Sequence, residues 1–143
     1  MSTFNAEQFM QTEIEQKGEV DYVPIPEAEY QGVIKELKPG TTPKGAAYLE
    51  VYWIIDDQEV RELMESDEVV CRQSIWLDIT DSGALDFGKN KNIKLNRLRD
   101  ALGQNDGKPW SPMMLMGQVA TVQVKHRLGD DGTPYAEIRG VRA

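Results

Sequence analysis

Two segments in the middle of the chain alternate between apolar and polar positions. In residues 47–56 every second residue is apolar, and residues 69–79 repeat the pattern with Gln73 as the exception. A period of two is typical of a strand that buries one face. We therefore predict a strand in each segment. Their inward positions are Leu49, Val51, Trp53 and Ile55 in the first, and Cys71, Gln73, Ile75, Leu77 and Ile79 in the second.

Three further strands follow from composition and turn signals. Residues 29–38 are rich in β-branched and aromatic side chains and stop at Pro39-Gly40, and Gly32 within them suits a bulge or a sharp bend. Residues 118–127 alternate again, and residues 134–141 follow them after the sequence Gly-Asp-Asp-Gly, which is a strong hairpin signal. These features predict an opening strand and a closing hairpin.

One helix is predicted with equal clarity. Residues 92–102 place most of their apolar side chains on one helical stripe, and Gly103 occupies the position where helices commonly stop. Residues 57–67 are charged and form either one short helix or a long loop. The apolar run at 113–116 has a buried character, but its structure type stays open.

The resulting order is three strands, one helix and two strands. An all-β, five-stranded OB-fold barrel of Greek-key type has its helix between strands three and four, and such barrels bind oligonucleotides across strands two and three. A small sheet with one helix packed on it is the alternative, and the order of elements does not distinguish the two. We expect one folded domain over residues 23–143, preceded by an arm over residues 1–22.

Charge is distributed unevenly along the chain, through either a functional division or a chance placement of charged loops. The 143 residues hold 24 acidic and 16 basic side chains, a formal net charge of -8. Residues 1–68 hold five basic and sixteen acidic side chains, whereas residues 69–143 hold eleven basic and eight acidic ones, so the two parts carry -11 and +3. Such asymmetry suggests an acidic arm attached to a basic working surface. In the arm, Phe9, Met10 and Ile14 have spacings compatible with one face of a short helix.

Candidate binding residues combine aromatic rings with cations. Single-stranded nucleic acid is bound by rings that stack on bases and by a basic groove that follows the phosphates. Alternation places such side chains on the outward faces of the second and third strands. In the closing hairpin, Lys125 and Arg127 share one face of their strand, and Tyr135 and Arg139 share one face of the next strand. Cross-strand packing is an equally good explanation for Tyr48 and Tyr52. The candidate nucleic-acid-binding residues are Tyr48, Tyr52, Arg72, Trp76, Lys125, Arg127, Tyr135, Arg139 and Lys44.

Several classes of function have little support in the sequence. One cysteine, Cys71, and one histidine, His126, cannot form an internal disulfide or a Cys/His zinc site. Cys71 suits an inert core thiol and His126 a buried or rim side chain, and no catalytic motif or phosphate-binding glycine loop is present. We therefore expect no enzyme, no cofactor and no metal. Apolar stretches are too short to span a membrane and no secretory signal is visible, so we expect a soluble cytoplasmic protein.

Short sequence motifs add a family resemblance. They are VPIPEAEY at 23–30, GAAYLEV at 45–51, SIWL at 74–77, KLNRLRDALG at 94–103, LMGQVA at 115–120 and GV at 140–141. Together they resemble a group of bacteriophage proteins, long catalogued as a domain of unknown function, that look like OB-fold single-stranded DNA-binding proteins. The resemblance covers roughly residues 23–143 and leaves the arm outside. Many members have Asn-x-Ile/Val near their final strand, where this chain has Ala136-Glu137-Ile138.

The resemblance implies a protein that binds single-stranded DNA without strong sequence preference, in phage replication or recombination and in the host cytoplasm. The arm would then dock replication or recombination proteins, or occupy the basic groove until DNA displaces it. The alternative is an accessory or virion-associated module that binds protein and has no nucleic-acid role. The acidic total charge favours that alternative, because phosphate binding depends on Lys and Arg.

Overall fold

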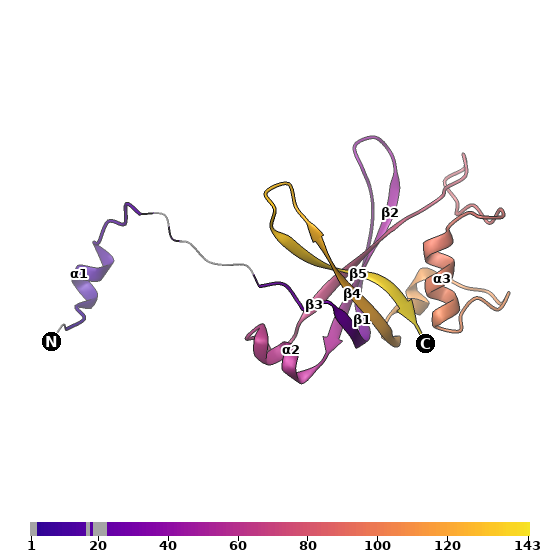
Figure 1. Ribbon diagram of the computed structural model, residues 1–143. Coiled ribbons are helices and arrows are strands. Elements are labelled where there is room, and N and C mark those ends of the chain that lie inside the picture. Colours follow the sequence, from indigo (N-terminus) through magenta and orange to yellow (C-terminus); the bar gives the residue numbers. More distant parts are fainter. Residues whose placement is uncertain (1–2, 17, 19–22) are drawn as a thin grey trace.

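The main body of the molecule is a single antiparallel sheet of five strands (Figure 1). The computed structural model describes residues 3–16, 18 and 23–143. In space the strands follow the order β3-β2-β1-β4-β5, so β3 and β5 are the edges of an open sheet. The strands are β1 (Ala28–Thr41), β2 (Ala47–Asp56), β3 (Val70–Trp76), β4 (Val119–Leu128) and β5 (Pro134–Arg142). The described helices are α1 (Ala6–Met10), α2 (Gln58–Leu63), α3 (Ile93–Ala101) and the 3-10 helix η1 (Pro112–Leu115).

The sheet curves until its two edges approach each other. β3 and β5 are not hydrogen-bonded neighbours, yet they are in contact, and α3 contacts both of them. All five predicted strands and the predicted helix before β4 are confirmed. The architecture is therefore a mostly-β fold of barrel-like character with a few short helices.

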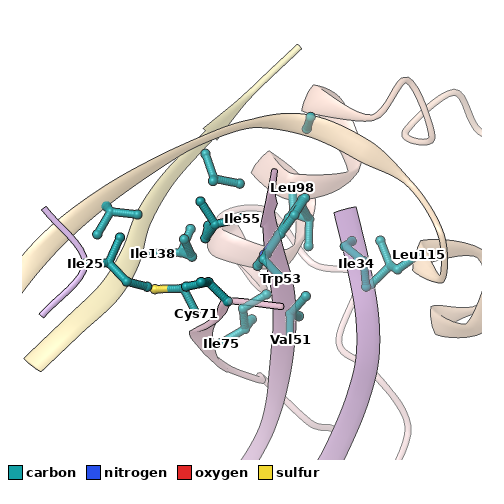
Figure 2. Packing of buried hydrophobic residues seen from close by; sticks show 14 of the residues in the cluster. Ile25, Ile34, Val51, Trp53, Ile55, Cys71, Ile75, Leu98, Leu115 and Ile138 are labelled. Atoms are coloured by element: carbon teal, nitrogen blue, oxygen red, sulfur yellow. The ribbon is translucent and has the colours of Figure 1, made fainter. Parts of the chain in front are cut away.

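The core lies on the concave side of this curved sheet. Leu49, Val51, Trp53 and Ile55 are each at most 4 % exposed, which confirms the inward face predicted for β2. Figure 2 shows Trp53 among side chains from the sheet and from α3, with Ile55 and Leu98 close by. The indole Nε1 donates to Gln73 Oε1 over 2.9 Å, so the one polar residue on the inward face of β3 satisfies the buried ring.

Gly32 was expected to form a bulge or bend, and that prediction is wrong. Gly32 pairs regularly with Ile55, and the bulge lies between Ile34 and Glu36. A Cβ on Gly32 would lie 3.0 Å from Cε3 of Trp53, which is closer than side-chain contacts normally allow. The glycine therefore makes room for the indole rather than bending the strand.

Two strand ends also differ from the prediction. β1 does not stop at Pro39-Gly40 but continues to Thr41, because this part of β1 has a neighbouring strand on one side only and such edges tolerate proline. β3 ends at Trp76 instead of residue 79. The backbone N–H and C=O of Asp78 bond to the Asn92 side chain, over 2.8 and 3.0 Å, which draws the chain off the sheet.

The segments that the sequence left open are now assigned. Residues 58–63 form α2, capped by Asp57, whose carboxylate accepts the Val60 N–H over 2.9 Å. In the apolar run at 113–116 only Leu115 is buried, whereas Met113 is 71 % exposed, so the expected buried character of the run is wrong. Pro112 starts a tight 3-10 turn, which turns one of these side chains inward and leaves the others outside.

The arm contains a short helix that buries nothing. In α1 the Asn5 side chain accepts the Gln8 N–H over 3.0 Å, and no α1 residue is buried. Residues 1, 2, 17 and 19–22, which the arm prediction also included, lie outside the described residues. Within the described part of the chain, no helix is long and apolar enough to cross a membrane.

Candidate nucleic-acid interface

The outward faces of β1, β2 and β3 form a small grid of paired residues. Antiparallel register sets three residues side by side in each row of this grid, which we call the outer face. The three rows are Gly40–Tyr48–Trp76, Lys38–Glu50–Ser74 and Glu36–Tyr52–Arg72. Aromatic rings and cations are thus brought together on one surface, as alternation predicted.

The first row is an aromatic platform. The Tyr48 and Trp76 rings have centroids 6.0 Å apart and an interplanar angle of 81°, and Trp76 is 60 % exposed. A Cβ on Gly40 would lie only 2.5 Å from the Tyr48 hydroxyl oxygen, so the tyrosine lies across the glycine of the neighbouring strand. Tyr48 is held by packing, whereas the large exposed surface of Trp76 is open to a ligand.

The third row contains charged side chains, and the carboxylate of Glu50 in the second row partly neutralises Arg72. Arg72 Nη1 lies 3.3 Å from a Glu50 carboxylate oxygen, and the Tyr52 hydroxyl donates to the other oxygen over 2.7 Å. The Lys38 ammonium lies 5.1 Å from the centre of the Tyr52 ring. Because the carboxylate of Glu50 accepts its hydrogen bond, the pKa of Tyr52 is raised above its usual value.

A cleft opens beside this row, between the two edge strands. Its volume is about 480 Å³, and apolar residues including Ile25, Cys71 and Ala136 line part of it. Its polar and aromatic lining comes from four strands: Tyr52 from β2, Arg72 from β3, Arg127 from β4, and Tyr135 and Glu137 from β5. We call this space the hairpin cleft, because its lining includes residues of both the β1–β2 and the β4–β5 hairpin.

The β4–β5 hairpin contributes through its register. Arg127 pairs with Tyr135 and Lys125 with Glu137, so these residues share one side of the hairpin. The Glu137 carboxylate lies 3.7 Å from Nε of Arg127 and also bonds Arg139. The sequence did not single out Glu137, since nothing local indicates that one carboxylate serves arginines on two strands.

The nine candidates do not all meet in the hairpin cleft. Tyr52, Arg72, Arg127 and Tyr135 line it. Arg139 is linked to it through Glu137, and Lys125 stands opposite Glu137. Tyr48 and Trp76 form the platform farther along the outer face, and Lys44 lies in the turn at the tip of the β1–β2 hairpin.

The structure also shows contacts by which two further residues, Gly129 and Lys94, position their neighbours. A Cβ on Gly129 would lie 2.7 Å from the Tyr135 ring, so each hairpin holds a tyrosine across a glycine. Lys94, at the start of α3, donates to the backbone oxygen of Ser74 over 3.1 Å, which fixes a cation beside the edge of β3. Only tertiary contacts reveal these roles.

Cys71 and His126 take structural positions. Burial raises the pKa of the Cys71 thiol to about 12, which leaves it protonated and unreactive at neutral pH. His126 is half-buried, with Nε2 2.7 Å from the Ile25 carbonyl, and its backbone N–H donates to Glu27 over 2.9 Å. That bond is the main reason why the pKa of Glu27 is lowered. His126 is therefore a rim residue that ties the entering chain to β4, as expected.

Neither the scan of protein-family models nor the search of curated proteins finds a match for this chain. Among the described residues, no three His, Cys, Asp or Glu side chains gather in a way that could hold a metal ion.

Proposed function

We propose that this chain binds single-stranded DNA, without strong sequence preference, through the hairpin cleft and the adjoining outer face. Because the sequence resembles phage proteins of this kind, the proposed role is in phage replication or recombination, in the cytoplasm of the host cell. One observation carries it. Two tyrosines and two arginines from four different strands line a single cleft, with an exposed tryptophan on the face beside it.

The topology supports an OB-type barrel. β1, β2 and β3 are consecutive antiparallel neighbours, and β4 follows after a long connection and pairs with β1, an order that supports a Greek-key arrangement. α3 lies between β3 and β4 in the sequence, as in OB folds, and the edges β3 and β5 approach each other. OB folds bind oligonucleotides across strands two and three and the adjacent loops, where the candidate residues gather.

The chemistry fits weak sequence preference. Every base has a π-face, so Trp76 and the two cleft tyrosines can stack on any of them, at about 1–3 kcal/mol per base. Arg72 and Arg127 can hold phosphates, but each faces a carboxylate of Glu50 or Glu137. A phosphate must displace these carboxylates, so we expect moderate rather than very tight affinity.

A fluorescence titration with oligo-dT at several salt concentrations tests the proposal. Binding should quench Trp76, and with about three phosphate contacts the logarithm of the affinity should fall with a slope of about -2 against the logarithm of salt. A Trp76→Phe variant identifies the ring responsible: Trp53 is buried, and quenching that survives the substitution would come from the partly buried Trp110. An absence of binding, or an affinity indifferent to salt, would refute the proposal.

A second function has an observation of its own. Phe87 is 81 % exposed and Met113 71 % exposed, so the α3 end of the molecule presents large apolar side chains, which do not bind phosphates. Such surfaces commonly bind protein. An accessory module that binds protein through this end is therefore the alternative, and a chain that fails the DNA titration but associates with protein would support it.

A further inference from the structure

A second groove, distinct from the hairpin cleft, lies beside α3. Its volume is about 370 Å³, and its lining includes Phe87, Arg99, Lys108 and Trp110. Gln104 holds it together, because its side chain accepts from the Trp110 indole and donates to the Met114 carbonyl, each over 2.9 Å. This Arg99 groove shares no lining residue with the hairpin cleft.

Arg99 is a buried cation without a counter-ion. It is 8 % exposed, its guanidinium lies 4.4 Å from the centre of the Trp110 ring, and it donates only to neutral oxygens of Asn96 and Gln104, over 3.0 and 3.3 Å. Its Nε finds no acceptor. Throughout the described ranges, no carboxylate lies within ion-pair distance of it. Burying an unpaired charge costs free energy, which an anionic ligand in the groove would offset.

The surface around the groove is apolar and basic. Phe87, Met113 and Met114 are 81 %, 71 % and 45 % exposed. Residues 85–116, which include the whole lining of the groove, hold six basic and three acidic side chains, a net of +3. Methionine side chains adapt to irregular apolar partners, so this end suits a peptide that combines carboxylates with aromatic or aliphatic side chains.

The arm of the chain has that composition. Residues 3–16 hold three acidic side chains, Glu7, Glu13 and Glu15, and no basic one. Their large apolar side chains are all more than half exposed: Phe4, Phe9, Met10 and Ile14. The Phe4 and Phe9 rings pack on each other, with centroids 5.4 Å apart, and leave their outer surfaces free for a larger apolar partner.

We propose that the Arg99 groove receives the acidic arm of a second copy of this chain. The hairpin cleft is the poorer acceptor, because its arginines already face Glu50 and Glu137. In the Arg99 groove the exposed Lys108 lies 3.8 Å from Asp106, but Arg99 itself has no such carboxylate among the described residues. A second copy is the better donor, because the chain enters its own domain near α2 and Ile25, which lines the hairpin cleft, whereas α3 lies toward the opposite end of the sheet (Figure 1). The proposal does not depend on DNA binding.

Self-association of the full chain is the first test. Sedimentation velocity over a concentration series should show the wild-type chain associating reversibly. Phe87→Asp should weaken the association roughly tenfold or more, the loss expected when a buried contact is replaced by repulsion. Leu63→Asp is the matched control, since Leu63 is an exposed apolar side chain on α2, away from the groove, and should associate as the wild type does. A wild-type chain that stays monomeric throughout would overturn the proposal.

A peptide of residues 3–16 is the second test, with a fluorescent label and anisotropy as the readout. The full chain should bind it, and both Arg99→Lys and Lys108→Glu should weaken binding, the latter roughly tenfold. The Lys108 side chain is 82 % exposed, so Lys108→Glu should fold even if Arg99 variants do not. A peptide that carries Glu7→Gln, Glu13→Gln and Glu15→Gln should bind the wild-type chain as weakly as the unaltered peptide binds Lys108→Glu. Equal binding by the wild type and Lys108→Glu, or displacement of oligo-dT by the peptide, would place the arm elsewhere and overturn the proposal.

Discussion

Two tryptophans on the paired strands β2 and β3 have opposite surroundings. Trp53 faces inward, is 0 % exposed and donates to Gln73, whereas Trp76 faces outward, is 60 % exposed and touches Tyr48. The same residue type in one ladder is therefore part of the core on one face and an exposed ring on the other. Because a large exposed ring adds little to the stability of the fold, Trp76 is the residue on the outer face that the proposed DNA binding uses most directly.

The largest effect should come from the inward tryptophan. Trp53→Ala removes a fully buried indole, which should cost about 3–5 kcal/mol of unfolding free energy, and it leaves Gln73 without its partner. Urea denaturation followed by circular dichroism measures this loss. Trp53→Phe keeps a ring but not the N–H and should cost less. A midpoint equal to the wild type in both variants would contradict the assignment of Trp53 to the core.

Replacement of the outward tryptophan should reduce DNA affinity more than it reduces stability. Trp76→Ala should lose about 1–3 kcal/mol of oligo-dT affinity, because one base loses its stacking partner. Its unfolding free energy should change by less than about 1 kcal/mol, since it loses only one edge contact with Tyr48. Anisotropy with labelled oligo-dT, beside urea denaturation of the same variant, separates the two quantities. If Trp76→Ala kept its oligo-dT affinity but lost stability, Trp76 would be a structural residue and not a binding one.

The carboxylate on the outer face should have a smaller effect of opposite sign. Glu50→Gln frees Arg72 from its ion pair and should tighten oligo-dT binding roughly two- to fivefold, as surface ion pairs are worth up to about 1 kcal/mol. It should also lower the pKa of Tyr52 toward its usual value, which an ultraviolet pH titration detects. Glu29→Gln is the control, because Glu29 pairs with Arg142 away from the cleft. Weaker binding by Glu50→Gln alone would show that this carboxylate contacts the bases.

The smallest effect concerns the thiol on the inward face. Burial raises the pKa of Cys71 from about 9 to about 12, so the protonated form is favoured in the folded state. The stability this contributes is complete below pH 9 and is lost as the pH rises toward 12. At pH 8 a thiol-specific reagent should therefore react with Cys71 only after urea unfolds the chain. Rapid reaction of the folded protein would show that the inward face of β3 becomes accessible to solvent at Cys71.

Local patterns predicted most of the strands. β2 spans residues 47–56 as predicted, and its inward face is buried, because alternation over ten residues depends only on local geometry and burial. The end of β3 could not be predicted in this way. It depends on hydrogen bonds between Asp78 and Asn92, fourteen positions apart, which no local pattern contains.

The candidate site was predictable only in part. Alternation predicted that Tyr52 and Arg72 face outward, and the register between β2 and β3 makes them direct neighbours. Their meeting with Arg127 and Tyr135 depends on the curvature that brings β3 and β5 together. Lys44 lies in the turn between β1 and β2, where the sequence placed it, and does not line the cleft.

The sequence alone determined the five strands and which side chains share a face of β2, since period and turn residues are local properties. Only the tertiary structure decided which faces meet, that Glu50 and Glu137 neutralise the cleft arginines, and that Arg99 is buried without a carboxylate. The reason is physical. Ion pairs and clefts form between residues far apart in the chain, and the packing of the whole sheet fixes their distances.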